Sequence, residues 1–253
     1  YTSGNEQRLV MIGSNSSTRA FTTSPAGGTI AVRNITLQGG GFSTSIVGWT
    51  ANAKITVTNE LRLIDSHLQN GTNDVTVLPG GTVALQATDT SQQMRHYLEG
   101  NLVRRMSAVN TDLLYPVGSF NTGTSIHNYT PVTLRPSTLY DTVQDIRVRS
   151  VGGAPTACSS FTLPGTLSWM PRSYVISKKN AGDSNSWGAG TMTLGLSPTE
   201  MAGLDLNSIR VWKNQFGSCE ERTVTARVAV AGTTPGSGTI NLNIAGVTAT
   251  DLD

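Results

Sequence analysis

Apolar and polar residues alternate with a period of two in short runs along the whole chain. The longest run, Thr29–Leu37, places Ile30, Val32, Ile35 and Leu37 among polar neighbours. This period is typical of β-strands that bury one face, so the pattern predicts strands throughout. The other runs are Lys54–Thr58, Leu61–Ile64, Asp74–Leu78, Val83–Leu85, Pro131–Leu134, Asp145–Arg149, Thr191–Leu194, Ile209–Trp212, Thr223–Val230 and Thr239–Ile244.

Turn residues separate these runs at short intervals. The clearest turns are Gly39–Gly41, Asn70-Gly71, Pro79–Gly81 and Gly152-Gly153. Closely spaced turns of this kind are typical of β-sandwiches, barrels and solenoids. One segment, Ser197–Gly203, has a helix start signal, because Ser can cap and Pro can occupy the first helical position. We therefore predict an all-β protein with at most a single helical turn.

The chain divides into two regions that differ in sequence pattern and composition. Residues 1–94 carry short strands joined by Gly-rich turns, which predicts a short β-solenoid-like or open-sheet N-terminal part, although no repeat period is fixed. Residues 95–253 hold both Cys and every Trp except Trp49, and we expect them to form an antiparallel β-sandwich domain.

Composition narrows the possible partners. Charged residues make up 13% of the chain, about half the usual ~25%, so Thr, Ser, Asn and Gly must cover the surface. The net charge of +2 is too small to attract nucleic acid by counterion release. No apolar stretch reaches the roughly 18 residues of a membrane helix. The chain starts at Tyr1 without a signal-peptide pattern, and we expect a mature or excised portion.

The two cysteines, Cys158 and Cys219, lie outside any metal-ligand spacing. If they pair, they close a loop of about 60 residues, which stabilises the fold by roughly 4 kcal/mol in the chain-entropy model. A disulfide indicates an oxidising compartment. Two buried, reduced thiols remain the alternative.

The most distinctive passage joins three segments, His96–Arg105, Leu114–Gly118 and Tyr129–Leu134. It resembles a pattern of large surface and type IX-secreted proteins of Bacteroidetes, in which a Y-x-x-G-x-L-x-R strand precedes a Tyr-Pro-Val-Gly turn and a Y-x-P-V-x-L strand. The upstream stretch 61–83 is similar to the solenoid-like lead-in of those proteins, so the resemblance covers roughly residues 55–135. A C-terminal secretion domain is not recognisable in this chain.

This resemblance implies an adhesin-like or matrix-like protein of the extracellular space or cell surface, with no catalytic residues to carry over. It also suggests O-glycosylation at an Asp-Thr-aliphatic site, for which Thr142 is the best match. Within the turn, Pro116 fixes φ, and Gly118 suits a place where a Cβ would clash. We expect Tyr115 and Tyr129 to pack with their hydroxyls in contact with water.

Residues suited to catalysis or metal binding are scarce. The three histidines, His67, His96 and His127, stand alone in the sequence, and we expect the last two to be polar surface residues. The loop at Asp183 resembles a calcium loop, but Trp187 occupies a position where a ligand is needed. No nucleotide, hydrolase or metalloprotease motif is present. We therefore predict a protein that is not an enzyme, with no metal and no cofactor.

Three functions remain. The first is a structural or adhesive surface protein that associates with itself, with other surface proteins or with glycans, and whose terminal strands, such as Thr239–Ile244, add to a neighbour's sheet. The second is a carbohydrate-binding module that stacks sugars on Trp187, the best exposed candidate. The remaining Trp candidates are Trp49, Trp169 and Trp212. The third is a viral or phage structural protein, because jelly-roll sandwiches share this composition.

Overall fold

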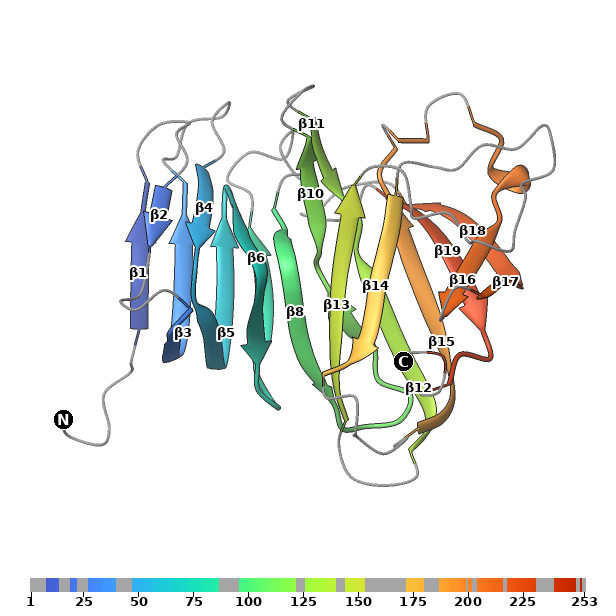
Figure 1. The fold of residues 1–253 in the computed structure, drawn as a ribbon, viewed down its shortest axis with the longest axis horizontal. Coiled ribbons are helices and arrows are strands. Elements are labelled where there is room, and N and C mark those ends of the chain that lie inside the picture. Colours follow the sequence, from blue (N-terminus) through green and yellow to red (C-terminus); the bar gives the residue numbers. More distant parts are fainter. Residues whose placement is uncertain are drawn as a thin grey trace.

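The computed structural model describes residues 8–13, 19–21, 27–39, 47–86, 96–121, 126–139, 144–152, 172–179, 187–198, 200–201, 204–215, 218–230, 239–248 and 251. In this part the protein is all-β, as predicted (Figure 1). Its strands form a mixed ten-stranded sheet, an antiparallel five-stranded sheet and two separate hairpins.

Parallel pairing dominates the first half of the ten-stranded sheet. Strands β1 to β8 pair in parallel with one another, and β8, β13 and β14 then pair antiparallel. No solenoid is detected among the described strands. The strands are β1 (Arg8–Ile12), β2 (Arg19–Phe21), β3 (Thr29–Gln38), β4 (Val47–Ala51), β5 (Lys54–Ile64), β6 (Ser66–Val77), β7 (Thr82–Gln86), β8 (Leu98–Met106), β13 (Gln144–Gly152) and β14 (Arg172–Lys178).

Parallel pairing in register places side chains of the same kind next to one another on neighbouring strands. The ladder β1-β3-β5-β7 aligns one row of Leu9, Ile35, Leu61 and Val83, and a second row of Met11, Leu37, Leu63 and Leu85. Because side chains alternate between the two faces of a strand, both rows lie on the same face. The members on the inner strands β3 and β5 are fully buried, so the alternation seen in the sequence produces this part of the core.

A third row of side chains crosses from the parallel strands into the antiparallel ones. Val75 of β6 pairs with Leu102 of β8, which pairs with Val148 of β13. All three side chains are fully buried. The sheet is therefore continuous across the boundary expected near residue 95, and strands of the two predicted regions share it (Figure 1).

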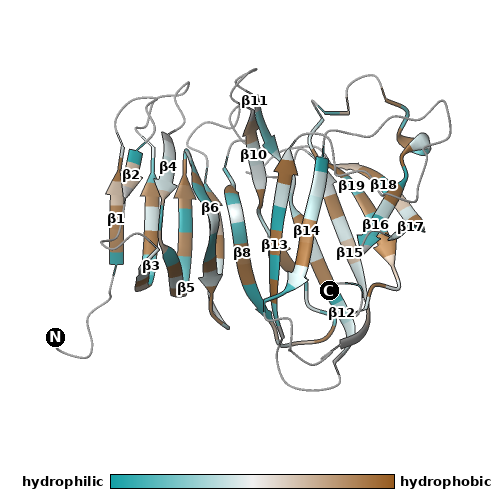
Figure 2. Cartoon of the chain, in the orientation of Figure 1, coloured by the Kyte–Doolittle hydropathy of each residue, from teal (hydrophilic) through white to brown (hydrophobic). Residues whose placement is uncertain are grey.

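The five-stranded sheet has the order β18-β19-β15-β12-β9. Its buried residues Leu134, Leu194 and Leu242 belong to the same hydrophobic core as Leu102 and Val148 of the large sheet. Apolar and polar bands alternate along β12 and β15 in Figure 2. The strands are β9 (Leu113–Tyr115), β12 (Val132–Leu139), β15 (Trp187–Leu196), β18 (Val224–Val230) and β19 (Thr239–Ala245).

Two hairpins and a short helix complete the described structure. The hairpins are β10–β11 (Gly118–Asn121 and Ile126–Tyr129) and β16–β17 (Val211–Gln215 and Ser218–Arg222). One 3-10 turn, η2 (Leu206–Ser208), is the helical element in the described chain. In the segment where we expected a single helical turn, the backbone N–H groups of Glu200 and Met201 donate to Ser197 O and Pro198 O, so two overlapping turns form there. None of the described helical structure is long and apolar enough to cross a membrane.

Candidate functional site

Edge strands lie toward the two ends of the molecule. Among the described strands, β1 pairs with β3 alone and β18 pairs with β19 alone. Figure 1 places these two strands toward opposite ends of the long axis. Val10 on β1 is 44% exposed, Ile12 is 68% exposed, and Val228 on β18 is 46% exposed. An edge strand with exposed apolar side chains offers N–H and C=O groups for pairing with another chain.

The expectation that Thr239–Ile244 adds to a neighbouring sheet is wrong. In the structure this segment forms β19, which is paired on one side with β15 and on the other with β18. Its apolar alternation arises because Leu242 and Ile244 face the core, where they are 2% and 1% exposed. Its hydrogen bonds are therefore made within the molecule, and the edge strand β18 is the one next to it.

A polar groove of about 530 Å³ lies on one face of the five-stranded sheet. Thr133, Thr193 and Asn243 pair in register across β12, β15 and β19. The Thr193 hydroxyl donates to Asn243 Oδ1 at 2.9 Å. At one side, Arg135 and Asp112 form an exposed ion pair at 3.6 Å. Hydroxyl and amide groups both donate and accept hydrogen bonds, so this face suits a neutral polar ligand.

The histidines are not isolated in the structure. The His67 ring lies 5.1 Å from that of His127 and stacks on Tyr97 at 5.3 Å, between ring centroids. Phe120 contacts His127 at 4.6 Å. The Tyr97 hydroxyl is 3.0 Å from His127 Nδ1. Residues 30 apart in sequence thus form one aromatic cluster, which no local motif indicates.

His96 is also buried, so our expectation of a surface position is wrong. Its Nδ1 accepts a hydrogen bond from the backbone N–H of Ser66 at 3.2 Å, and its side chain is fully buried. This bond ties the chain before β8 to the start of β6. The described residues contain no group of three or more His, Cys, Asp or Glu side chains arranged to hold a metal ion.

Burial, and to a smaller extent the nearby His96, lower the pKa of His67 to about 4. The folded protein therefore favours neutral His67. Between pH 6.5 and about 4 the unfolded chain binds a proton that the folded chain does not, so the free energy of unfolding decreases as the pH falls. Below about pH 4 both states are protonated and the loss is complete, at roughly 3 kcal/mol.

We expect urea midpoints to show this loss in the wild-type chain between about pH 7 and about pH 4.5. The variant His67→Phe keeps the ring stacking but cannot titrate, so its midpoint should change less over the same interval. Equal pH dependence in both proteins would show that His67 is not the group responsible.

A buried ion pair fixes β14 to its surroundings. Arg172 of β14 and Glu200 form a bidentate pair, and their side chains are 2% and 8% exposed. The Arg172 Nη1 group also donates to the hydroxyls of Ser119 and Ser150, each at 2.9 Å. Thr130 shares a 2.7 Å hydrogen bond with Ser150. The network joins β10, β13 and β14 to the turn before Met201, and it satisfies a charge that would otherwise be costly to bury.

The Tyr-Pro-Val-Gly passage is a packed core feature. Tyr115 and Tyr129 are 0% and 2% exposed, and burial raises the pKa of both hydroxyls. Our expectation that these hydroxyls contact water is therefore wrong. The clash expected at Gly118 is confirmed, because a Cβ there would lie 2.5 Å from Asn128 O and 2.6 Å from the Tyr97 ring.

The structure describes the side chains of two of the four tryptophans, Trp49 and Trp212. Trp49 is 3% exposed in the core, so it offers no stacking surface, and Trp212 is half-buried in β16. Trp187 begins β15 opposite Leu139, but its side chain lies outside the described residues, as does Trp169. Glycan stacking on Trp187 therefore stays a prediction.

The other sites expected from the sequence also stay predictions. Cys219 is half-buried in β17 opposite Asn214, whereas Cys158 lies outside the described residues. Their pairing therefore stays a prediction. Thr142 and the loop at Asp183 lie outside the described residues too.

Comparisons with known proteins identified no relative of this chain. A scan against protein-family models, a search of curated proteins and a search of solved structures each found no match to the chain.

Proposed function

We propose that this protein is a secreted, cell-surface structural or adhesive protein whose copies join end to end into an extracellular filament or matrix. The observation that carries the proposal is the pair of edge strands, β1 and β18, toward opposite ends of the long axis (Figure 1). A contact between two different surfaces of identical chains forms an open assembly when its rotation does not close a ring.

The occupant of the β1 edge is, in this proposal, the β18 edge of a second copy. Exposed valines on both strands give each edge an apolar contact to bury, and the unpaired N–H and C=O groups supply hydrogen bonds. The role requires no catalytic group. Extracellular placement rests on the resemblance of residues 55–135 to type IX-secreted surface proteins.

The finer architecture belongs to the same proposal. We infer that the aligned rows of β1, β3, β5 and β7 form a short solenoid-like lead-in, because parallel in-register stacking buries a continuous column of side chains. We also infer a β-sandwich for the later strands, supported by the core that the five-stranded sheet shares with β8 and β13.

The assembly proposal predicts the behaviour of three matched variants. Val10, Val175 and Val228 are 44%, 41% and 46% exposed, and each lies on an edge strand. A lysine on an edge strand opposes pairing with another chain. We expect Val10→Lys and Val228→Lys to abolish filaments in electron micrographs and large species in sedimentation. The control Val175→Lys, on β14, should assemble like the wild-type chain. Wild-type assembly by Val10→Lys would contradict the proposal.

A glycan-binding function is the second candidate, and the polar groove of the five-stranded sheet favours it. The groove presents Thr and Asn side chains from adjacent strands beside the Asp112–Arg135 pair. A glycan array tests this function with wild-type chain and Thr193→Val. Binding that is lost in Thr193→Val would support the groove, and absence of binding on the array would contradict it.

A further inference from the structure

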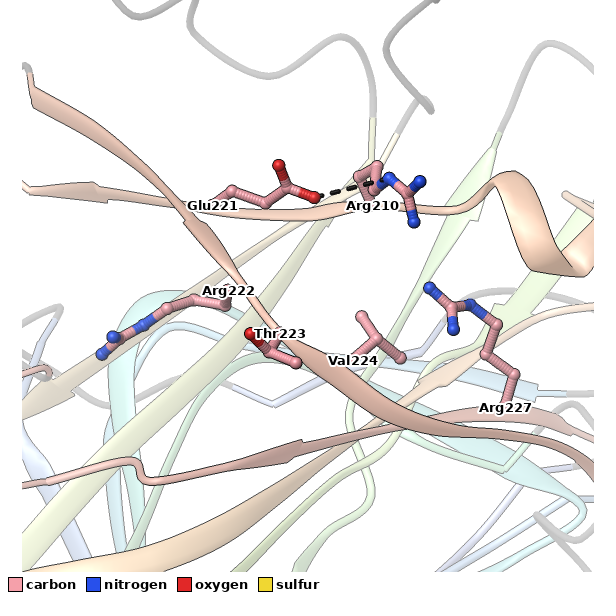
Figure 3. Close-up of a pocket in the computed structure, with 6 residues that line it drawn as sticks. All are labelled: Arg210, Glu221, Arg222, Thr223, Val224 and Arg227. Carbon is pink, nitrogen blue, oxygen red and sulfur yellow. Dashed lines mark ion pairs between the residues drawn. The ribbon is translucent and has the colours of Figure 1, made fainter.

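A second cavity, of about 350 Å³, lies where the β16–β17 hairpin meets β18 (Figure 3). Among the residues that the structure describes, three arginines and one carboxylate line it, together with a hydroxyl and an aliphatic side chain. The lining residues are Arg210, Glu221, Arg222, Thr223, Val224 and Arg227. The cavity is separate from the polar groove, because Arg227 and Val228 are consecutive on β18 and point to opposite faces of the strand.

The three arginines differ in how their charge is balanced. Arg222 forms ion pairs with Asp251 and Glu220, and it points away from the other two arginines in Figure 3. Arg210 Nε lies 3.4 Å from Glu221 Oε1, and both side chains are about half exposed. Such exposed pairs contribute little and are readily exchanged.

The positive charge of Arg227 is not balanced by a carboxylate among the described residues. Its Nη2 group donates to the backbone carbonyl of Ile209 at 2.9 Å, which satisfies a hydrogen bond but not the positive charge. In the described part of the chain, no carboxylate forms an ion pair with Arg227. Its Nε atom is buried and has no hydrogen-bond partner there. Arg227 therefore combines a positive charge without a paired carboxylate and an N–H donor without an acceptor, which is rare in native proteins.

We propose that this cavity binds the carboxylate of an acidic sugar, with Arg227 as the main anion-binding residue. A guanidinium group binds an oxyanion through two parallel N–H donors. Figure 3 shows Arg210 and Arg227 extending toward the same space, so Arg210 can supply a second positive group. The volume lies in the range of small-molecule sites, which leaves room for a sugar ring beside the carboxylate. The choice of a sugar rests on the proposed extracellular function.

Calorimetric titration of the full chain with glucuronate, glucose and inorganic sulfate tests this site. We expect glucuronate to bind and glucose not to bind. Arg227→Gln should weaken glucuronate binding by about tenfold or more, because a charge-assisted hydrogen bond is lost. Arg227→Lys should bind with intermediate affinity, since it keeps the charge but loses the planar fork. Arg33→Gln, on the exposed surface of β3, is the control and should bind as the wild type does.

A variant that binds more tightly distinguishes an effect on this site from a loss of folding. Glu221→Gln removes the one carboxylate among the described lining residues and releases Arg210, so glucuronate should bind several-fold more tightly. Unchanged binding in both Arg227→Gln and Glu221→Gln would overturn the proposal. Binding of sulfate without glucuronate would overturn the assignment to a sugar acid. Glucuronate binding is measured independently of assembly. Absence of glucuronate binding would therefore leave the filament proposal standing, and absence of filaments would leave the binding site standing.

Discussion

Replacing Glu200 with Gln is expected to lower the free energy of unfolding by about 3–5 kcal/mol, the usual effect of breaking a buried ion pair. The substitution leaves the Arg172 guanidinium with its charge in a site where the side chain is 2% exposed. The hydroxyls of Ser119 and Ser150 accept hydrogen bonds from it but carry no compensating charge. The cost therefore arises from an unpaired buried charge more than from one lost hydrogen bond.

Urea unfolding followed by tryptophan fluorescence measures this effect through the midpoint and slope. The control is Asp112→Asn, which breaks the exposed pair with Arg135 and should cost no more than about 1 kcal/mol. A double variant, Arg172→Met with Glu200→Leu, removes both charges and should recover much of the stability. Equal losses for Glu200→Gln and Asp112→Asn would show that the Arg172 network is not a stabilising charge pair.

Replacing Gly118 with Ala is expected to destabilise the fold by about 1–3 kcal/mol or more, as overpacking of a dense core does. The added Cβ would meet the Tyr97 ring and the Asn128 carbonyl at distances well inside van der Waals contact. Because Tyr97 also stacks on His67, displacement of its ring should disturb the whole aromatic cluster.

The matched control is Gly152→Ala, where the nearest atom, Ser119 Oγ, would lie 3.2 Å from the new Cβ. We expect a clearly smaller loss of stability there. Near-ultraviolet circular dichroism, which reports on packed aromatic rings, should change for Gly118→Ala and remain close to wild type for the control. An unchanged spectrum and an unchanged midpoint in Gly118→Ala would contradict this account of the turn.

The alternation of apolar and polar residues along single strands could be recognised from the sequence, because a strand that buries one face needs an apolar residue at every second position. The runs at Thr29–Leu37 and Thr239–Ile244 both lie within strands of the structure, β3 and β19. The first half of β6 could not be recognised, because Ser66, His67 and Asn70 are polar yet buried. Ser66 is satisfied by a distant strand, because its Oγ donates to Leu37 O at 2.8 Å, and His67 packs against the Tyr97 ring.

The candidate sites depend on pairing between residues far apart in the chain, and this explains what the sequence did not indicate. Arg172 and Glu200 meet across 28 residues, with no motif that marks either. The status of β19 as an inner strand follows from its two partners, β15 and β18, and not from its own alternation. The same holds for Arg227, whose surroundings are set by the β16–β17 hairpin.

The most direct test of the end-to-end account mixes the two variants that each lack one contact surface. Val10→Lys keeps a functional β18 edge, and Val228→Lys keeps a functional β1 edge. Sedimentation of each variant alone should show monomers, and an equimolar mixture should form dimers that grow no further, because a single compatible interface exists. Filaments in either variant alone, or a mixture that stays monomeric while the wild-type chain assembles, would contradict pairing of β1 with β18.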